Sequence, residues 1–303
     1  MTHAILWRSL ACLAFALLVL AALASFAAGE LLSRPAGATV GEPPAELRAR
    51  SVALQTAKGV RVAGWFARRS EGRGAVLLLH GVHGNRLSML ARAQWLAGLG
   101  YSVLLIDLPG HGESGGERIT FGLREAEGVR AALAFLRHEL PGERVGVIGV
   151  SLGAAATVLA RAQPAPDAVL LESMYPTIEE AVADRLEMRL GAPGRWLAPL
   201  LLVQLPLRLS VSTSELRPID AMATLHAPVF IISGSEDRHT TLSETRRICA
   251  AAVAPSECWI IEGAAHVDLH GFSPKAYELR VLGFLDRHLR PAYDQVTHER
   301  SPT

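Results

Sequence analysis

The 303-residue sequence has almost no excess of charge of either sign. Thirty Lys and Arg residues balance twenty-nine Asp and Glu residues, which gives a formal net charge of +1. The sequence also lacks a long basic run, an aromatic-basic stripe and zinc-finger spacing. Because proteins that bind nucleic acid carry a basic surface that neutralises phosphates, these absences argue against nucleic acid as a partner.

Cysteine is scarce, with three residues in the whole chain. Cys12 lies in an N-terminal apolar run, which leaves Cys249 and Cys258 as the pair in the rest of the chain. No third ligand with metal-binding spacing accompanies them, so they do not indicate a metal site. An oxidising compartment would permit a disulfide between them. The sequence does not give the Cα separation that a bridge requires, so a disulfide and two buried free thiols both stay open.

Charged residues are too few, at 19%, for a disordered chain, and apolar residues reach 50%. This composition predicts a globular protein with a sizeable core. The length allows one large domain or two smaller ones. We find no internal repeat and no composition shift that marks a boundary between two domains. The sequence therefore predicts one domain over residues 51–290, with a flexible tail over residues 291–303.

The N-terminal segment differs from the rest of the chain. From Ser9 to Gly29 no residue is charged, and most are Leu, Ala, Val or Phe. Twenty-one helical residues rise about 31 Å, close to the thickness of the hydrocarbon core of a bilayer. Residues 1–30 are therefore expected to form a transmembrane anchor or a signal peptide. A buried core helix is the weaker alternative, because the segment has no polar face.

The anchor and the signal peptide both stay open. Ser25-Phe26-Ala27 offers small residues at the spacing that signal peptidase accepts, but the run is longer than a signal core of about 7–15 residues. Arg8 precedes the run and Glu30 follows it. This charge bias predicts a cytoplasmic N-terminus and an exported globular part. That part is then either membrane-anchored or secreted after cleavage. The Pro- and Gly-rich stretch that follows predicts a linker over residues 31–50.

The pattern of apolar residues predicts the fold class. Residues 51–69 alternate apolar and polar side chains around Lys58-Gly59, as an antiparallel hairpin does. Short, nearly continuous apolar runs follow, as expected of strands covered on both faces. They are Ala75–Leu79, Ser102–Ile106, Arg144–Ile148, Ala168–Leu171, Val229–Ile232 and Trp259–Ile261. Helical patterns lie between most of them, at Leu87–Leu99, Gly122–Leu140, Leu152–Ala162, Leu242–Val253 and Lys275–Leu289.

This alternation predicts an α/β fold with a mostly parallel, doubly wound sheet. Residues 176–215 break it with a Leu-, Arg- and Pro-rich stretch that has no strand signal, so they are expected to form a short helical cap over the sheet. Its run WLAPLLLVQLPL is unusually apolar. A lipid-like substrate, a membrane-facing lid and ordinary cap core all explain such a run.

One serine stands in a setting that indicates catalysis. Gly149-Val150-Ser151-Leu152-Gly153 matches G-x-S-x-G, with an apolar strand before it and a helix after it. That context is the one in which the motif places a serine hydroxyl at the carboxyl edge of a parallel sheet. Glycines are needed on either side because a Cβ there would collide with the tight turn. A serine that only packs beside these glycines is the alternative.

A serine hydroxyl becomes a good nucleophile when a base accepts its proton. Among eleven histidines, His266 is the best placed, because a short loop connects it to the last apolar strand. Its imidazole is therefore expected at the same sheet edge as Ser151. His239 and His270 are the runners-up. His80 ends an earlier strand and is expected to support a loop.

The imidazole in turn needs a carboxylate that fixes its tautomer. Asp237 follows the preceding apolar strand through a loop of small residues, which makes it the first candidate. Glu236 is the local alternative, and Asp268 is a weaker one because it lies two residues from His266. The predicted order Ser151, Asp237, His266 is the chain order expected of this fold.

Two backbone N–H groups are candidates for an oxyanion hole. Leu152 follows the nucleophile, and Val82 lies in HGVHGN after an early strand. Gly81 and Gly84 permit the tight backbone that directs the Val82 N–H. A phosphate-binding turn is the alternative, but G-x-x-G without a following Lys-Ser/Thr is not a nucleotide signature.

At these residues the chain resembles serine hydrolases of the α/β-hydrolase superfamily, most closely the bacterial group with a short helical cap and a membrane-proximal N-terminus. The resemblance covers residues 51–289. Its five ordered stretches are LLLHGVHGNR, LLIDLPGHGES, VIGVSLG, IISGSEDRHT and IIEGAAHVDL. It implies that Asp107 and His111 belong to a structural turn. Where many relatives have glycine this chain has His83, whose side chain is expected to narrow the acyl pocket or offer a hydrogen bond.

The residues and the resemblance predict the same chemistry. Ser151 attacks an ester-like carbonyl of a small-molecule acyl substrate, and water hydrolyses the acyl-enzyme without a metal or organic cofactor. Acyl transfer to another acceptor and peptide hydrolysis would use the same residues. A non-catalytic binding module on this fold is the third alternative. The natural substrate and the oligomeric state stay open.

Overall fold

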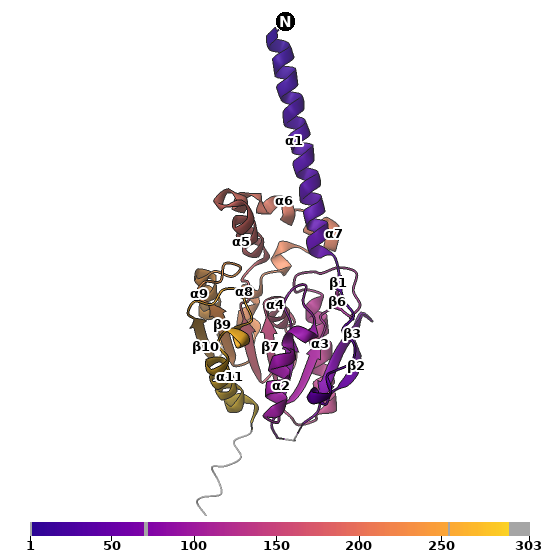
Figure 1. The fold of residues 1–303 in the computed structure, drawn as a ribbon, viewed down its shortest axis with the longest axis vertical. Helices are drawn as coiled ribbons and strands as arrows, with labels where there is room; N and C mark the ends of the chain where they lie inside the picture. The colour runs from indigo at the N-terminus through magenta and orange to yellow at the C-terminus, as the bar shows by residue number, and fades with distance from the viewer. Residues whose placement is uncertain (1, 70–71, 254, 291–303) are drawn as a thin grey trace, which may run out of the picture.

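The structure is a computed structural model that describes residues 2–69, 72–253 and 255–290. A long N-terminal helix, α1 (Thr2–Ser33), projects from an α/β body (Figure 1). The sheet of this body has eight strands. They are β2 (Arg50–Gln55), β3 (Arg61–Ala67), β4 (Ala75–Leu79), β5 (Ser102–Ile106), β7 (Val145–Val150), β8 (Ala168–Glu172), β9 (Val229–Gly234) and β10 (Ser256–Ile261).

The strand order is β10-β9-β8-β7-β4-β5-β3-β2. β4, β5, β7, β8, β9 and β10 run parallel, and the β2–β3 hairpin joins β5 in the antiparallel sense. The predicted α/β fold and hairpin are therefore confirmed. The parallel strands read as unbroken apolar runs because both of their faces are covered: every residue of β4 is buried.

Helices cover both faces of the sheet. On one face, α2 (Leu90–Gly98) and α11 (Pro274–Leu289) pack on alternate side chains of the strands, such as Leu78 and Ile148. On the other face, α3 (Glu125–Glu139) and α4 (Leu152–Leu159) pack on residues such as Leu77 and Val147. The helices α8 (Pro218–Ala221) and α9 (Leu242–Ala251) extend that second layer toward β9. A short α10 (Leu269–Phe272) precedes α11.

Four helices, α2, α3, α4 and α9, are shorter than the sequence pattern predicts, and local contacts explain the ends of α3 and α4. The pattern begins at Gly122, but α3 begins at Glu125, because the Glu125 carboxylate accepts hydrogen bonds from the N–H groups of Thr120 and Gly122 and holds them in a loop. At the other boundary, α4 ends at Leu159 rather than Ala162. Arg161 there takes a left-handed backbone with φ of 43°.

The expected linker over residues 31–50 is not a free tether. Helix α1 continues to Ser33, and β1 (Ala36–Gly37) pairs with β6 (His111–Gly112) in a small parallel ladder. The N–H groups of Val40 and Gly41 both bond to the Glu113 carboxylate. The segment therefore lies against the body. The expected tail over residues 291–303 lies outside the described residues.

Residues 176–215 contain helices, as the pattern predicts. They are α5 (Ile178–Leu190), α6 (Ala198–Leu202) and α7 (Leu205–Leu209), with 3₁₀ turns at Ala192–Leu197 and Thr213–Glu215. The Thr177 side chain accepts the Glu180 N–H and so caps the start of α5. The apolar run of the cap divides between core and surface. Ala198 and Leu205 are buried, whereas Leu200, Val203 and Leu207 are exposed, so cap core explains only part of the run.

Cys249 on α9 and Cys258 on β10 form a disulfide, with a Cα–Cα distance of 6.0 Å. Of the two outcomes that the sequence left open, the structure therefore has the bridge. The bridge joins the last helix before β10 to that edge strand of the sheet. Such a link fits the oxidising compartment that the predicted export implies.

Candidate active site

Ser151 lies on the turn between β7 and α4, at the carboxyl end of a central strand. Its backbone has φ of 51° and ψ of −106°, a conformation that non-glycine residues rarely adopt. The Ser151 N–H bonds to the Glu172 carbonyl at 2.8 Å, and its own carbonyl accepts the Ala155 N–H. Strain of this kind persists where the surroundings impose it, and it is common at functional sites.

The two glycines of the motif are required by close packing. A Cβ on Gly149 would lie 2.7 Å from the Ala154 nitrogen. A Cβ on Gly153 would lie 2.6 Å from the Leu79 carbonyl oxygen. Both positions press against backbone atoms, which cannot move aside as a flexible side chain can. Glycine at these two positions therefore lets α4 begin directly beneath the strand that carries Ser151.

Asp237 and His266 come together from different loops. Asp237 follows β9 and is buried, and His266 follows β10 with its side chain 23% exposed. The His266 Nδ1 lies 2.8 Å from Asp237 Oδ2. The other oxygen, Oδ1, accepts the N–H groups of His239 and Thr240. The carboxylate is thus held on both sides, and it fixes the plane of the imidazole.

Charge and tautomer at this pair follow from its hydrogen bonds. Burial acts to raise the pKa of Asp237, but the hydrogen bonds from His266 and from the Thr240 and His239 amides outweigh it and lower the pKa below its ordinary value. Asp237 is therefore ionised at neutral pH and can only accept from the ring. The His266 Nδ1 must carry the hydrogen, which leaves the Nε2 lone pair free to take a proton.

Ser151 and His266 line one cleft of about 470 Å³, together with Val82. Leu152 does not line this cleft but lines an adjoining lobe of about 230 Å³, to which Ser151 and Val82 also contribute. The structure thus places the predicted nucleophile, the predicted base and the two predicted oxyanion donors around two connected hollows at one edge of the sheet. Asp237 lies behind His266, out of the cleft.

The runner-up residues have other partners. The His239 ring packs against the His266 ring in a tilted arrangement with 4.8 Å between centroids, and burial, Arg185 and His266 lower its pKa to about 4. It is therefore neutral at pH 7 and packs beside the predicted base. Glu236 is exposed, and nothing in the described hydrogen bonds joins its carboxylate to His266.

His270 and Asp268 are also engaged elsewhere. The His270 Nε2 lies 2.9 Å from Glu278, and its ring packs on Trp95 and Tyr277. Asp268 forms an ion pair with Arg92 at 2.6 Å. His270 is therefore engaged away from the role of base for Ser151, and Asp268 pairs with Arg92 rather than with the His266 ring.

The loop after β4 carries the predicted oxyanion donor Val82. The Gly84 N–H bonds to the Gly81 carbonyl at 3.1 Å, which closes a tight turn. His83 takes φ of 58° in this turn. Glycine adopts this left-handed conformation most readily, so a histidine at this position carries backbone strain. The His83 side chain contributes to the wall of the 230 Å³ lobe.

His80 supports this loop, as predicted from its place at the end of a strand. Its ring is fully buried, and its Nε2 accepts the Leu108 N–H at 3.0 Å. Its Nδ1 therefore carries the hydrogen and donates to the Gly81 carbonyl at 2.7 Å. Burial, followed by the nearby His111, lowers the pKa of His80 to about 3. A neutral imidazole thus joins the oxyanion loop to the turn after β5.

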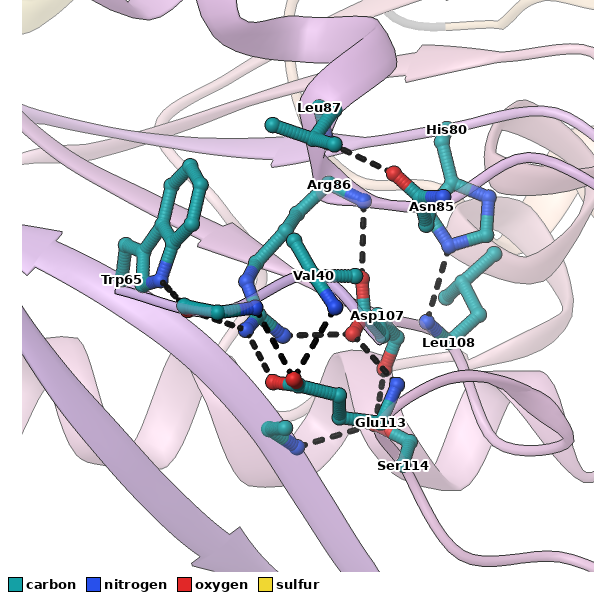
Figure 2. A network of polar contacts seen from close by, with 12 residues as sticks. Val40, Trp65, His80, Asn85, Arg86, Leu87, Asp107, Leu108, Glu113 and Ser114 are labelled. Atoms are coloured by element: carbon teal, nitrogen blue, oxygen red, sulfur yellow. Dashed lines mark hydrogen bonds and ion pairs between the residues drawn. The ribbon is translucent and has the colours of Figure 1, made fainter. Parts of the chain in front are cut away.

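The turn after β5 is built on a buried ion network (Figure 2). The Asp107 carboxylate accepts the Arg86 N–H, the Arg86 guanidinium and the Glu113 N–H at 2.7, 2.5 and 2.8 Å. Arg86 also pairs with Glu113 and lies over the Trp65 ring at 4.8 Å. His111 is buried in the same turn, with its Nδ1 at 3.1 Å from the Pro109 carbonyl. Asp107 and His111 point away from the cleft and act as scaffold.

Sequence reasoning did not identify two arginines that line the cleft. Arg92 on α2 is buried and pairs with Glu172 through Nη2 at 2.7 Å, while its Nη1 reaches Asp268. It thereby ties the loop that carries His266 to the body. Arg185 on α5 lines both hollows and donates to the Ala181 carbonyl at 2.7 Å. Burial lowers the pKa of Arg185. No motif marks either residue, because each reaches the site through tertiary packing.

Two carboxyl groups meet where the cap joins the body. Burial, and then the neighbouring Asp184, raise the pKa of Glu244 to about 7. Asp184 on α5 accepts Arg195 at 2.8 Å with one oxygen, and its other oxygen is buried without a donor among the described hydrogen bonds. A proton on Glu244 would supply that donor, which is consistent with the raised pKa.

Glu244→Gln is expected to raise the Tm at pH 8 by about 2–4 °C, the shift that 1 kcal/mol produces in a domain of this size, and to leave the Tm at pH 5 unchanged. The folded pKa of Glu244 lies above its unfolded value, so its stabilising proton is present at low pH and is lost as the pH rises through about 7. Glutamine keeps an oxygen for the Thr241 N–H. Thermal unfolding at both pH values measures the effect. The exposed Glu257→Gln serves as control, and equal shifts of Tm at pH 5 and pH 8 would contradict the prediction.

Within residues 2–69, 72–253 and 255–290, no group of three or more His, Cys, Asp or Glu side chains is arranged to hold a metal ion. The hollows at the sheet edge are bordered by hydroxyl, imidazole, guanidinium and apolar groups. A strained serine after a parallel strand, an Asp–His pair at the same edge and a cap between two strands together define the α/β-hydrolase fold.

The comparisons with known proteins agree with this class. The sequence profile of the family described as "Serine aminopeptidase, S33" matches residues 70–224. An uncharacterized protein of Mycobacterium tuberculosis is 34% identical over 223 residues, which are 72% of this chain and 73% of that protein. The uncharacterized protein YqkD of Bacillus subtilis is 24% identical over 82% of this chain and 83% of its own.

Solved structures share the fold. The Pyrococcus furiosus esterase Pf2001 superposes with a TM-score of 0.69 and 24% identity, over 84% of this chain and all of that one. An esterase of Exiguobacterium antarcticum gives a TM-score of 0.58 at 13% identity, over 78% of this chain and 99% of its own. The chain belongs to the serine aminopeptidase S33 family of α/β-hydrolases and is a serine hydrolase in class.

Proposed function

We propose that the protein hydrolyses an ester-like acyl bond through an acyl-enzyme on Ser151. The observation that carries this proposal is the 2.8 Å contact between His266 Nδ1 and Asp237 Oδ2 at the rim of the cleft that also contains the strained Ser151. Asp237 is ionised and accepts from the His266 Nδ1, so in the neutral ring Nε2 is the nitrogen that can take a proton. This is the arrangement that activates a hydroxyl group.

In this mechanism the Ser151 Oγ attacks the carbonyl carbon while His266 takes its proton. The N–H groups of Val82 and Leu152 donate to the oxyanion. When the C–O bond to the leaving group breaks, His266 returns the proton to the departing alcohol. Water then attacks the acyl carbon with His266 again as base, which releases the acid and restores the hydroxyl. Asp237 keeps the imidazole oriented and stabilises its charged form.

The lobe and the cleft suit different parts of such an ester: its acyl chain and its alcohol. The lobe of about 230 Å³ is bordered mainly by apolar side chains, among them Leu152, Ile178 and Val182, and suits an acyl chain. The cleft of about 470 Å³ includes Arg92, Arg185 and Asp268 and suits a polar leaving group. An ester of an apolar acid and a polar alcohol fits this division.

Covalent labelling tests the proposal directly. A fluorophosphonate probe is expected to add one phosphonyl group to the full-length protein, and peptide mass spectrometry is expected to locate it on Ser151. Asp237 is buried behind the imidazole and has a lowered pKa, so it is ionised and orients His266. His266 can then accept the proton of the Ser151 hydroxyl, which is why this hydroxyl should react with the probe. A protein that binds no probe while it remains folded would contradict the proposed nucleophile and favour a binding module.

Peptide hydrolysis is the second candidate, because the matching family is described as a serine aminopeptidase. Acyl transfer is a third use of the same groups. A panel of p-nitrophenyl esters and aminoacyl p-nitroanilides distinguishes ester from amide substrates, and competition between water and an added alcohol distinguishes hydrolysis from transfer. We expect ester hydrolysis to dominate both comparisons.

We also propose that α1 is a retained anchor. Residues Leu6–Ser33 are long and apolar enough to cross a bilayer. Three cap-to-helix contacts favour retention over cleavage: Gln204 donates to the Ser25 carbonyl, Arg208 donates to the Phe26 carbonyl, and Arg208 pairs with Glu30. A removable signal peptide has no need of such contacts with the mature protein.

Intact mass spectrometry of the protein from membranes is expected to find the N-terminal residues present. Alkaline carbonate is expected to leave the protein in the membrane fraction, because a single apolar helix of this length holds it there. An exported domain should in addition be accessible to protease from outside the inner membrane. A mature chain that begins near Ala28 would contradict the anchor and establish a cleaved signal peptide.

A further inference from the structure

The apolar lobe beside Ser151 extends toward the N-terminal helix. Ser151 and Val82 lie at one part of its wall, and Leu32 of α1 lies at another. Val182 of the cap helix α5 and Phe121 complete the apolar lining between them. A residue in the last turn of α1, the helix whose earlier part is apolar enough to cross a membrane, is therefore part of the wall of the candidate active site.

A second, smaller cavity continues in the same direction. It holds about 30 Å³ and lies among α1, α5, α6 and α7. Both cavities share Leu32, Phe121, Ile178 and Val182 as lining residues. Apolar surface thus runs from the serine, past the last turns of α1, to the underside of the cap helices.

Helix α1 is fixed to the cap at this level. The Ser25 hydroxyl donates to the Leu200 carbonyl at 2.8 Å, and Gln204 donates to the Ser25 carbonyl at 3.1 Å. The Arg208 guanidinium lies 4.3 Å from the centre of the Phe26 ring and also pairs with Glu30. The position of the cap is therefore set by the part of α1 that enters the body.

The cap exposes a large apolar face next to this contact. Trp196 is 85% exposed, Val203 is 67% exposed and Leu207 is 90% exposed. Helices α6 and α7 lie beside the lower part of α1, on the side of the body from which α1 departs (Figure 1). Large apolar side chains that are this exposed on one short segment indicate an interaction surface rather than ordinary protein surface.

The geometry of α1 identifies the occupant of that face as the bilayer. Residues 6–25 rise about 30 Å, which already spans the hydrocarbon core. Residues 25–33, which contact the cap, then lie at the level of the interface between lipid and water. Helices α6 and α7 are held against these residues, so their apolar face meets the membrane surface. Trp196 there has the residue type that favours this level.

We propose that the substrate is a long-chain acyl ester presented by the bilayer that α1 crosses. Its acyl chain leaves the membrane between α1 and the cap and lies in the apolar lobe, which places the ester carbonyl at Ser151. The polar alcohol then occupies the cleft that holds Arg92 and Arg185. This inference rests on the proposed serine hydrolase activity and deepens it. The bond broken is the acyl C–O bond. The alcohol leaves with the proton of the Ser151 hydroxyl, and water then supplies the hydroxyl group of the released acid and the proton that restores Ser151.

The first test narrows the lobe. Full-length protein in phosphatidylcholine vesicles is assayed with a vesicle-borne oleoyl monoglyceride and with p-nitrophenyl acetate. Leu32→Trp is expected to lower the ratio of oleoyl to acetyl turnover by roughly tenfold or more, because bulk in an apolar pocket discriminates by chain size. Leu31→Trp is the matched control, since Leu31 is an exposed neighbour on the same helix that lines neither cavity. Equal ratios in the two variants would overturn the inference.

The second test concerns the membrane face. Leu207→Glu is expected to lower the ratio of turnover of the oleoyl ester in vesicles to its turnover in detergent by several-fold, because a charge weakens apolar contact with the bilayer. Leu279→Glu is the control, since Leu279 is 76% exposed on α11, away from the cap. Equal ratios in these two variants would show that substrate does not come from the bilayer at this face.

Labelling by a fluorophosphonate distinguishes a failure of the bilayer inference from a failure of the proposed hydrolase activity. If the variants still label at Ser151 and the ratios do not shift, the acyl-ester activity stands and the bilayer inference is wrong. If the wild-type protein neither labels nor hydrolyses p-nitrophenyl acetate, the proposed activity itself is wrong, and the inference is wrong with it.

Discussion

Ser151→Ala is expected to lower kcat for a short p-nitrophenyl ester by roughly 10⁶, the order of loss when the nucleophile of a serine hydrolase is removed. The hydroxyl lies on a turn with φ of 51°, beside the cleft that His266 also lines. Alanine removes the atom that forms the covalent bond and leaves the backbone donors in place. Steady-state hydrolysis by full-length protein in detergent, with probe labelling in parallel, measures the effect.

The variant should fold as the wild type does, because Ser151 contributes no side-chain hydrogen bond to the cap of α4. Its Tm is therefore a check on the interpretation. Ser273→Ala provides a matched control, since that serine precedes α11 without a side-chain cap hydrogen bond and lies outside both hollows. Undiminished hydrolysis by Ser151→Ala at an unchanged Tm would show that another group is the nucleophile.

The sheet could be predicted from sequence because its strands are covered on both faces. The run Ala75–Leu79 coincides with β4, and Ser102–Ile106 coincides with β5, since helices from both sides leave no position for a polar residue. Helix ends were less predictable. Glu125 captures two backbone N–H groups and delays the start of α3, a contact that no periodic pattern announces.

Those residues of the candidate site that directly follow a strand could be predicted from the sequence, because the end of the strand determines where they lie. Asp237 and His266 follow neighbouring parallel strands, β9 and β10, so the fold alone brings them to one edge. His239 lies in the same loop as Asp237 and is a runner-up to the predicted base His266. In the structure the His239 amide, rather than its ring, bonds to Asp237.

The parts that sequence could not predict are contacts between distant segments. Arg92 reaches Asp268 across 176 residues of chain, and Leu32 reaches the lobe beside Ser151 from a stretch that composition assigns to a linker. Such contacts depend on where α2 and α1 pack, and neither helix carries a motif. The role of His80 was predictable only in part. Its place after β4 indicates that it supports a loop, but its hydrogen-bond partner, the Leu108 N–H, follows from the order of the strands in the sheet.

The buried network in Figure 2 supplies the largest expected loss of stability. Asp107→Ala is expected to lower the free energy of unfolding by about 3–5 kcal/mol, the cost of leaving one member of a buried ion pair alone. The side chains of Arg86 and Asp107 are 2% and 0% exposed. Chemical denaturation of the full-length protein in detergent measures the loss. Glu139→Ala, which removes a surface pair with Arg50, is the control and is expected to cost about 0–1 kcal/mol.

A double-mutant cycle tests why Asp107→Ala is costly. Burial raises the pKa of Asp107 although the Glu113 and Arg86 amides donate to it, so the carboxylate itself gains little from its site. The cost comes instead from the Arg86 guanidinium, which loses its partner in a place where water cannot replace it. Arg86→Met in the Asp107→Ala background should therefore cost less than Arg86→Met alone, with a coupling of about 0.5–3 kcal/mol. Strictly additive losses would show that the two side chains stabilise the turn independently.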